Sequence, residues 1–310
     1  MAKQPIRIGA RGSKLSRVQA ETVRAAIARS LGADEAAVIV TITTTGDRIQ
    51  DRTLADIGGK GLFTKEIEEA LADGRIDCAV HSLKDMPAID PPGLVIAALP
   101  EREDPRDAFV SPGFDSLAAL PSGARLGTAS LRRQAQALNR RPDLQILAVR
   151  GNVDTRLAKL ASGEADALLL AAAGLIRLGL ADQIRAFVDP RQSPPAPGQG
   201  ALAIQCRVED AEAPWLADLR HAPTMLAVAA ERGALTALDG SCRTAMGAYA
   251  AVTDGRLRLH IEALSPDGRR SFSGAEDIDV AAGEPAARDL GLTLGRSIAA
   301  QAGGAMTAPA

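Results

Sequence analysis

A lysine and an aspartate stand next to each other, as Lys84 and Asp85, in the polar stretch from His81 to Pro87. The stretch follows an apolar segment, Cys78–His81, that we expect to form a strand, so its polar groups would project from a strand end, where ligands usually bind. A cation beside a carboxylate in one short turn can stabilise a developing positive charge or move a proton. The alternative is a surface ion pair, which contributes little to stability. The two residues alone leave both interpretations open.

Arginines recur at the ends of predicted strands and in the first turns of the helices that follow. The set is Arg11, Arg132, Arg133, Arg150, Arg156 and Arg177. Guanidinium groups bind carboxylates through paired hydrogen bonds, and free N–H groups at helix starts also attract anions. Any one of these arginines could be a solvated charge balanced by one of the 38 acidic residues. As a set, they predict a ligand with several carboxylates or phosphates.

The three cysteines are far apart and contain no C-x-x-C pair, which argues against a disulfide framework and a structural zinc site. Cys242 lies in the turn 239–244, after a predicted helix. A loop position would leave its thiol accessible, and Arg243 would favour the thiolate, whereas a buried loop cysteine is the alternative. Cys78 and Cys206 lie within or at the end of predicted strands, and we assign both a structural role.

The segment 58–65 is rich in glycine and carries Lys60 and Lys65. It fails the phosphate-loop pattern because Gly61, and not Ser or Thr, follows Lys60, so a phosphate-loop enzyme is disfavoured. A lid over an anionic ligand is the functional interpretation, and a plain glycine-rich turn is the alternative. No metal-ligand spacing occurs and the three histidines are not clustered, so no metal is expected.

The composition is that of a globular protein with an aliphatic core. A chain of 310 residues exceeds what one core usually serves, so two or three domains are expected. A formal net charge of −2 argues against a nucleic-acid or membrane-surface binder. The amino-terminal residues show no secretory signal, and the longest apolar run, Ala167–Ile176, is too short to span a bilayer. We therefore expect a cytoplasmic protein.

Short apolar or β-branched runs alternate with helix-period stretches, which predicts open α/β sheets with helices on both faces. In a first series, strands are expected over 6–10, 38–43, 78–81 and 94–99, and helices from Ser13 onward and over 64–72. In a second series, strands are expected over 107–110, 125–127, 145–149 and 167–170, and helices over 130–139 and 152–160. After a proline-rich linker, 188–200, a strand over 201–205 could return to the first sheet. A helix over 224–238 and strands over 248–252 and 256–263 predict a small α+β domain.

Taken in order, these segments resemble one family, hydroxymethylbilane synthase, also called porphobilinogen deaminase. The matching strings occupy 11–16, 45–47, 58–63, 81–87, 127–133, 150–157, 197–200 and the Cys242 loop. The resemblance covers about the first 250 residues and is weak from Ala250 onward. Ser241 stands where the family often has glycine, and Arg243-Thr244 is an unusual continuation, but serine is well suited to turns.

The resemblance implies two α/β domains like those of periplasmic binding proteins, around a cleft, plus a smaller C-terminal α+β domain. The implied boundaries are 1–101 with 198–220 for domain 1, 102–197 for domain 2, and 221–310 for domain 3. It also implies a transferase that joins four porphobilinogen units head to tail with loss of ammonia. The chain would grow on a dipyrromethane cofactor, held by a thioether to Cys242, and water would release hydroxymethylbilane for tetrapyrrole and heme biosynthesis. Separately, the near-neutral net charge and the few aromatic residues favour a monomer.

The same resemblance assigns roles to individual positions. Asp85 corresponds to the catalytic acid. Positions that correspond to cofactor-binding residues are Asp47, Ser82, Lys84, Thr128, Ser130, Arg132, Arg133 and Arg150. Positions that correspond to substrate-binding residues are Arg11, Ser13, Lys60, Phe63, Arg150, Arg156, Arg177 and Gln199. Each pyrrole ring carries an acetate and a propionate, so the growing chain would accumulate negative charge that the arginines could neutralise.

Two other classes of protein use a similar cleft. A non-catalytic binding protein of the periplasmic type could bind a small carboxylate there, but it would carry a signal peptide and would not require the loop cysteine. An acidic aldehyde reagent for pyrroles, applied to denatured protein, would separate it from the enzyme. A LysR-type effector domain is disfavoured because no helix-turn-helix segment or basic stripe precedes it.

Overall fold

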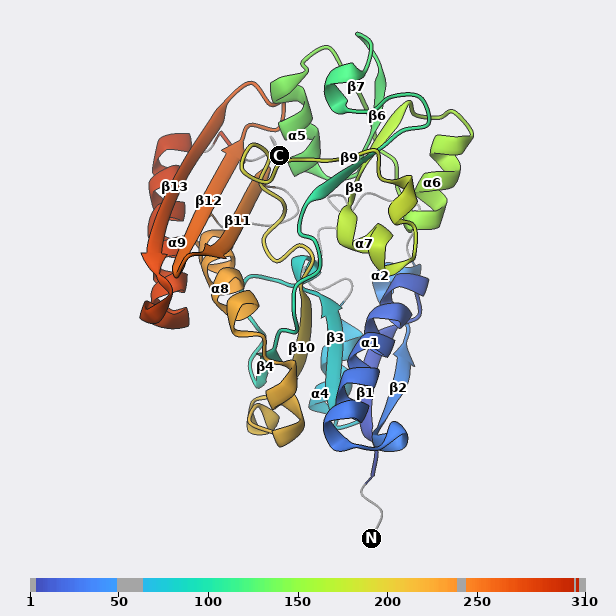
Figure 1. Ribbon diagram of the computed structural model, residues 1–310, viewed down its shortest axis with the longest axis vertical. Helices are drawn as coiled ribbons and strands as arrows, with labels where there is room; N and C mark the ends of the chain where they lie inside the picture. Colours follow the sequence, from blue (N-terminus) through green and yellow to red (C-terminus); the bar gives the residue numbers. More distant parts are fainter. Residues whose placement is uncertain (1–3, 49–63, 239–243, 304, 307–310) are drawn as a thin grey trace. The chain divides into compact units, whose positions relative to one another are not determined.

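The computed structural model describes residues 4–48, 64–238, 244–303 and 305–306 (Figure 1). The chain forms two compact units, residues 1–103 with 201–225, and residues 104–200 with 226–310. Three of the predicted site residues, Lys60, Phe63 and Cys242, lie outside the described residues, as does the side chain of Asp47. Within the described parts of the chain, no helix is both long and apolar enough to pass through a membrane.

The first unit is built on a five-stranded mixed sheet with the order β2-β1-β3-β10-β4. Its strands are β1 (Ile6–Arg11), β2 (Ala37–Ile42), β3 (Cys78–Ser82), β4 (Leu94–Ala98) and β10 (Leu202–Arg207). β1 is parallel to β2 and β3, whereas β10 runs antiparallel to β3 and β4. The prediction that the segment after the proline-rich linker returns to the first sheet is confirmed.

Helices cover both faces of this sheet, as predicted. The longer ones are α1 (Lys14–Leu31) and α4 (Lys65–Ala72). The unit also contains the short α2 (Thr45–Arg48) and the 3-10 helices η1 (Asp34–Ala36), η2 (Leu83–Asp85), η5 (Val208–Asp210) and η6 (Pro214–Leu219). Val23 and Ile27 of α1 pack with Ile8 and Ile204 of the sheet. On the other face, Ile67 and the rest of the apolar side of α4 form a second cluster. The helix α1 begins at its predicted N-cap, Ser13, whose side chain accepts a hydrogen bond from the Ser16 amide.

The second unit contains another five-stranded mixed sheet, with the order β7-β6-β8-β5-β9. Its strands are β5 (Asp107–Val110), β6 (Arg125–Gly127), β7 (Gln145–Leu147), β8 (Ala167–Ala171) and β9 (Ala186–Phe187). Its helices are α5 (Leu131–Arg140), α6 (Val153–Ala161), α7 (Ala172–Arg177), η3 (Leu117–Ala119) and η4 (Ala181–Gln183). Ser130 and Asn152 are the N-caps of α5 and α6, which are the next elements in the chain after β6 and β7.

The remainder of the second unit is an antiparallel sheet of three strands, β11 (Met246–Thr253), β12 (Arg256–Leu264) and β13 (Ser271–Asp279). The helices α8 (Ala222–Ala237) and α9 (Gly283–Ala302), the latter preceded by η7 (Val280–Ala282), share one aliphatic core with this sheet. The predicted fold class, two α/β sheets plus a smaller α+β part, is thereby confirmed. The residue boundaries of three domains stay a prediction.

Glycines bring α8 and α9 into close contact. A Cβ atom added to Gly291 would overlap the carbonyl oxygen of Ala230 and lie 2.8 Å from the Ala234 nitrogen. Because backbone atoms cannot move aside as a flexible side chain can, the two helices would have to separate.

Replacing Gly291 by Ala is therefore expected to lower the free energy of unfolding by about 1–3 kcal/mol, despite the higher helix propensity of alanine. Urea unfolding measures the effect. Thr293→Ala is the control, because Thr293 is exposed on the same helix. Equal stability of the two variants would show that the helices do not pack this closely.

Candidate active site

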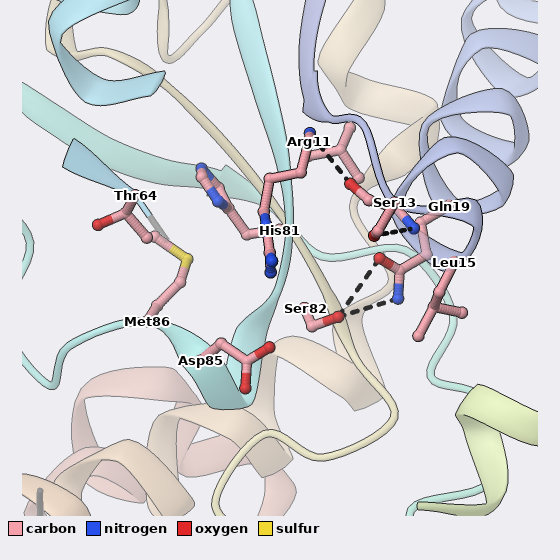
Figure 2. A pocket seen from close by; sticks show the side chains of 11 residues that line it. Arg11, Ser13, Leu15, Gln19, Thr64, His81, Ser82, Asp85 and Met86 are labelled. Carbon is pink, nitrogen blue, oxygen red and sulfur yellow. Dashed lines mark hydrogen bonds between the residues drawn. The ribbon is translucent and has the colours of Figure 1, made fainter. Parts of the chain in front are cut away.

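A pocket of about 80 Å³ opens at the carboxyl ends of β1 and β3 in the first unit (Figure 2). Arg11 is the last residue of β1, and Ser82 is the last residue of β3. The two strands are parallel, so their carboxyl ends meet at the same edge of the sheet. Asp85, in the 3-10 turn η2 after β3, and Ser13, before α1, also line the pocket. The structure thus brings together Arg11, Ser13, Ser82 and Asp85.

Hydrogen bonds fix the wall of the pocket that α1 contributes. The Arg11 amide donates to Ser16 Oγ at 3.1 Å, which connects the end of β1 to the helix that follows. Gln19 Nε2 donates to Ser82 Oγ at 2.9 Å, and the Ser82 hydroxyl lies 3.3 Å from Gln19 Oε1 (Figure 2). Sequence reasoning missed Gln19, although its position three residues after Ser16 places both side chains on one face of α1.

The charges around the pocket differ in their exposure. The Asp85 side chain is exposed, whereas Lys84, its neighbour in the same turn, is half-buried and does not line this pocket. His81 is buried behind them, and burial lowers its pKa to about 4, helped by the positive charge of Arg11 and opposed by the amide of Gln205. At neutral pH the imidazole is uncharged, so Arg11 and Asp85 are the charged side chains among the lining residues that the structure describes.

The depressed pKa of His81 makes stability depend on pH. The unfolded chain takes up a proton below about pH 6.5, whereas folded His81 takes one up only near pH 4. The contribution of the neutral imidazole, on the order of 3 kcal/mol, is therefore present above pH 6.5 and is lost as the pH falls toward 4. We expect wild type to lose more stability on acidification than His81→Gln, measured by urea unfolding across this range. If the free energies of unfolding of the two proteins fell in parallel between pH 6.5 and pH 4, the low pKa of His81 would be contradicted.

In the second unit, the structure places Arg132 and Arg133 in a buried network. Their side chains are 5% and 6% exposed, and both guanidinium groups contact the carboxylate of Asp107. Gln199, a predicted substrate ligand, is fully buried, and its amide donates to Asp107 Oδ1 at 2.8 Å and to the Pro105 carbonyl at 2.8 Å. Sequence reasoning missed Asp107, because no residue near it in the sequence indicates a functional site there.

The other predicted ligands of the second unit lie closer to its surface or at helix starts. Thr128 is buried, its hydroxyl accepts a hydrogen bond from the Ser130 amide at 3.2 Å, and Ser130 in turn caps α5. Arg150 and Arg156 are both half-buried, on either side of the N-cap of α6. Arg156 Nε donates to the Gly151 carbonyl at 2.9 Å. Arg177, also half-buried, donates to the Gly200 carbonyl at 2.7 Å.

Two cysteines can be examined in the described residues. Cys78 and Cys206 are fully buried, as expected for the structural role predicted for them. Burial raises the pKa of the Cys78 thiol far above its ordinary value and that of Cys206 to about 11. Both are therefore neutral thiols that neither a ligand nor a reagent can reach easily. The described residues contain no cluster of histidine, cysteine and carboxylate side chains suited to a metal ion.

The chain is an α/β protein with a polar pocket at the strand ends of a mixed sheet, lined by an arginine and an exposed carboxylate. Residues 6–214 match the family described as "Porphobilinogen deaminase, dipyromethane cofactor binding domain", and residues 225–300 match "Porphobilinogen deaminase, C-terminal domain". The chain belongs to the porphobilinogen deaminase family. Members of this family are transferases with a dipyrromethane cofactor. The resemblance that sequence motifs supported to about residue 250 thus extends to residue 300.

Individual relatives agree with this assignment over the whole chain. The porphobilinogen deaminase of Caulobacter vibrioides strain NA1000 / CB15N is 60% identical to it over 100% of this chain and 100% of the relative. That of Phenylobacterium zucineum is also 60% identical, over 99% of this chain and 99% of the relative. Among solved structures, a nutrient binding protein from Burkholderia cenocepacia bound to methionine is 16% identical, with a TM-score of 0.42, over 69% of this chain and 89% of that chain.

Proposed function

We propose that the chain joins four porphobilinogen molecules head to tail with release of ammonia and then releases the product, hydroxymethylbilane, by hydrolysis. The observation that carries the proposal is the pocket of the first unit, in which a guanidinium group, hydroxyl groups and an exposed carboxylate converge from β1, α1 and η2. Porphobilinogen carries an acetate, a propionate and an amine-bearing carbon on one pyrrole ring. A cation for the carboxylates and an anion for the reacting ring are the groups that this chemistry requires.

The second unit has a charge balance suited to an acidic cofactor. Arg132, Arg133 and Arg140 are linked to two carboxylates, Asp107 and Glu262, so three guanidinium groups face two negative charges. Arg132, Arg133, Asp107 and Glu262 are buried and balance one another, so the excess positive charge is that of Arg140, whose side chain is 29% exposed and can attract an anion. Dipyrromethane has two pyrrole rings and four carboxylates, and its side chains therefore fit residues of this kind. Arg150, Thr128, Ser130, Lys84, Ser82 and Asp47 complete the proposed set of cofactor ligands.

When bound, dipyrromethane supplies a nucleophilic pyrrole carbon on which the polymer grows. The chain's own residues perform the remaining tasks. Arg11 binds a carboxylate of the incoming monomer, with Ser13 beside it, and Arg150, Arg156 and Arg177 neutralise the carboxylates that accumulate. Asp85 stabilises the positive charge that develops on the monomer ring as ammonia leaves, and it accepts or donates the proton that each addition requires.

Neutral His81 also contributes to this arrangement. A second full positive charge beside Arg11 would compete for Asp85 and oppose the cationic transition state. The low pKa of His81, about 4, keeps it uncharged at neutral pH. Arg11 can then bind the carboxylates of the substrate while Asp85 remains available to the reacting ring.

We further propose that Cys242 is the attachment point of the cofactor. The support from the described residues is that Cys78 and Cys206 are buried and carry raised pKa values, so neither offers a thiolate at neutral pH. A thioether suits the task because it neither exchanges like a disulfide nor hydrolyses like an ester. The growing chain can therefore stay attached through successive additions.

The test of the proposed function is a balance of substrate and products. Incubation with porphobilinogen should release one ammonia per monomer consumed and yield one hydroxymethylbilane for every four monomers. Binding of porphobilinogen without release of ammonia would instead support the rival class, a non-catalytic binding protein.

We also propose that the protein is a monomer of the cytoplasm. The large hydrophobic side chains exposed in the described residues are few and come from separate segments, which is normal for a monomer. Two buried free thiols are compatible with a reducing compartment. Light scattering after size exclusion, and fractionation of cells, measure the two properties.

A further inference from the structure

Asp107, the first residue of β5, is a buried carboxylate held between two guanidinium groups. Its side chain is 2% exposed. Oδ2 accepts a hydrogen bond from Arg132 Nη1 at 2.7 Å, and Oδ1 accepts from Arg133 Nε at 3.0 Å and Nη2 at 2.8 Å. Each oxygen thus serves mainly one arginine. Because charge-assisted hydrogen bonds are strong and directional, this carboxylate sets the orientation of both guanidinium planes.

Two glutamines complete the arrangement, one bound to the carboxylate and to Arg133, the other bound to Arg132. Gln199 Nε2 donates to Asp107 Oδ1 at 2.8 Å, and Gln199 Oε1 accepts from Arg133 Nη2 at 3.3 Å. On the other side, Gln136 Oε1 accepts from Arg132 Nη1 at 2.9 Å, while its Nε2 donates to the Pro194 carbonyl at 3.0 Å. The network therefore connects β5 and α5 with the segment 194–199 that leads out of this unit.

Such a network differs from an ordinary ion pair of the same sheet. Arg125 and Asp166 form a one-to-one pair whose side chains are 41% and 30% exposed, so solvent shares in their charges. Asp107 instead contacts two buried cations, Glu262 is linked to the same network through Gln136, and burying charges is costly. Burial alone would raise the pKa of Asp107, but the two arginines hold it far below its ordinary value, so the carboxylate remains charged. A core built only for stability would use apolar residues here.

We propose that Asp107 is a positioning residue, which orients Arg132 and Arg133 so that their guanidinium groups meet the acidic side chains of the cofactor. This inference rests on the proposed function, since it assumes that these arginines contact dipyrromethane. It assigns no contact with the cofactor to Asp107 itself. Asn at this position would keep the shape but present an amide N–H toward a guanidinium group, which can only donate. At least one arginine would then turn away.

The test follows cofactor assembly by intact mass. Full-length protein made without cofactor is incubated with porphobilinogen, and the gain in covalent mass is followed over time in wild type, Asp107→Asn and the control Asp166→Asn. We expect Asp107→Asn to assemble the cofactor about 10-fold more slowly or worse, as when other groups that orient a ligand-binding residue are removed. Asp166→Asn breaks an ion pair of the same sheet and should assemble at the wild-type rate.

A second readout reports position directly. In spectra of ¹⁵N-labelled protein, the Arg133 Nε–H group should exchange slowly in wild type and in Asp166→Asn, and rapidly in Asp107→Asn. If Asp107→Asn does not fold, Gln199→Leu removes the bracing amide and leaves the ion pair, and slower assembly is again expected. If Asp107→Asn folds and assembles the cofactor at the wild-type rate, the positioning role is wrong. If only Gln199→Leu folds, assembly at the wild-type rate in that variant has the same meaning. Neither result would contradict the proposed function. Failure of wild type itself to gain mass would instead contradict the proposed function.

Discussion

Replacing Asp85 by Asn is expected to lower the turnover of porphobilinogen by at least ~10²-fold, which is typical of the loss of a preorganised electrostatic group. The amide keeps the size of the side chain and removes its charge. The positive charge on the reacting ring then has no anion beside it, and the proton that each addition moves has no acceptor. Because the interaction exists mainly in the transition state, the loss should appear in kcat, with little change in KM.

The exposure of Asp85 makes this result interpretable. The side chain is exposed, and Asp85 belongs to a 3-10 turn whose apolar anchor, Leu83, is buried independently of it, so the substitution should leave the fold unchanged. Asp90→Asn is the matched control, since Asp90 lies in the same connection but does not line the pocket. We expect the control to retain turnover within about 2-fold. Turnover near the wild-type value in Asp85→Asn would remove this residue from the mechanism.

The parts of the site that the sequence predicted are those that depend on local order. A strand that ends in Arg11, an N-cap at Ser13 and a strand that ends before Asp85 each have a signal within a few residues. Once two such strands are parallel neighbours, their ends must meet, and the pocket follows from that rule. The juxtaposition of Arg11 and Asp85 therefore follows from the pairing of β1 with β3.

The buried network could not be predicted because its partners are far apart in the sequence. Asp107 is separated from Arg132 by 25 positions and from Gln199 by 92. Nothing in the sequence tells which of the 38 acidic residues pairs with which arginine. The two arginines were therefore expected at a cleft surface, whereas the structure has them 5% and 6% exposed beside one carboxylate.

The last two elements of the chain, β13 and α9, were missed for a different reason. The strand β13 (Ser271–Asp279) carries small and acidic residues and is mostly exposed, so it lacks the apolar alternation that marks a strand. The helix α9 contains Gly291 and Gly295, which lower helix propensity but permit the close contact with α8. In both elements, tertiary packing outweighs local preference.

Replacing Cys242 by Ser is expected to abolish the covalent gain in mass that wild type shows, and with it the ability to elongate. Serine keeps the shape of the side chain, but a hydroxyl is a far weaker nucleophile than a thiolate at neutral pH. A cofactor bound only by its carboxylates would leave together with the first product. Intact-mass spectrometry of the purified protein measures the outcome, because a thioether survives denaturation.

The control for this experiment is Cys206→Ala, which removes a thiol that is buried in the first sheet and carries a pKa of about 11. It should lose stability through the small cavity that it creates, yet retain the full cofactor mass. The two variants separate chemistry from folding. Cys242→Ser should be stable but lack the cofactor, whereas Cys206→Ala should be less stable but carry it. A wild-type protein that is fully active at its unmodified sequence mass would contradict covalent attachment. Cofactor mass retained in Cys242→Ser would move the attachment to another residue, and the burial of Cys78 and Cys206 makes either of them a poor alternative.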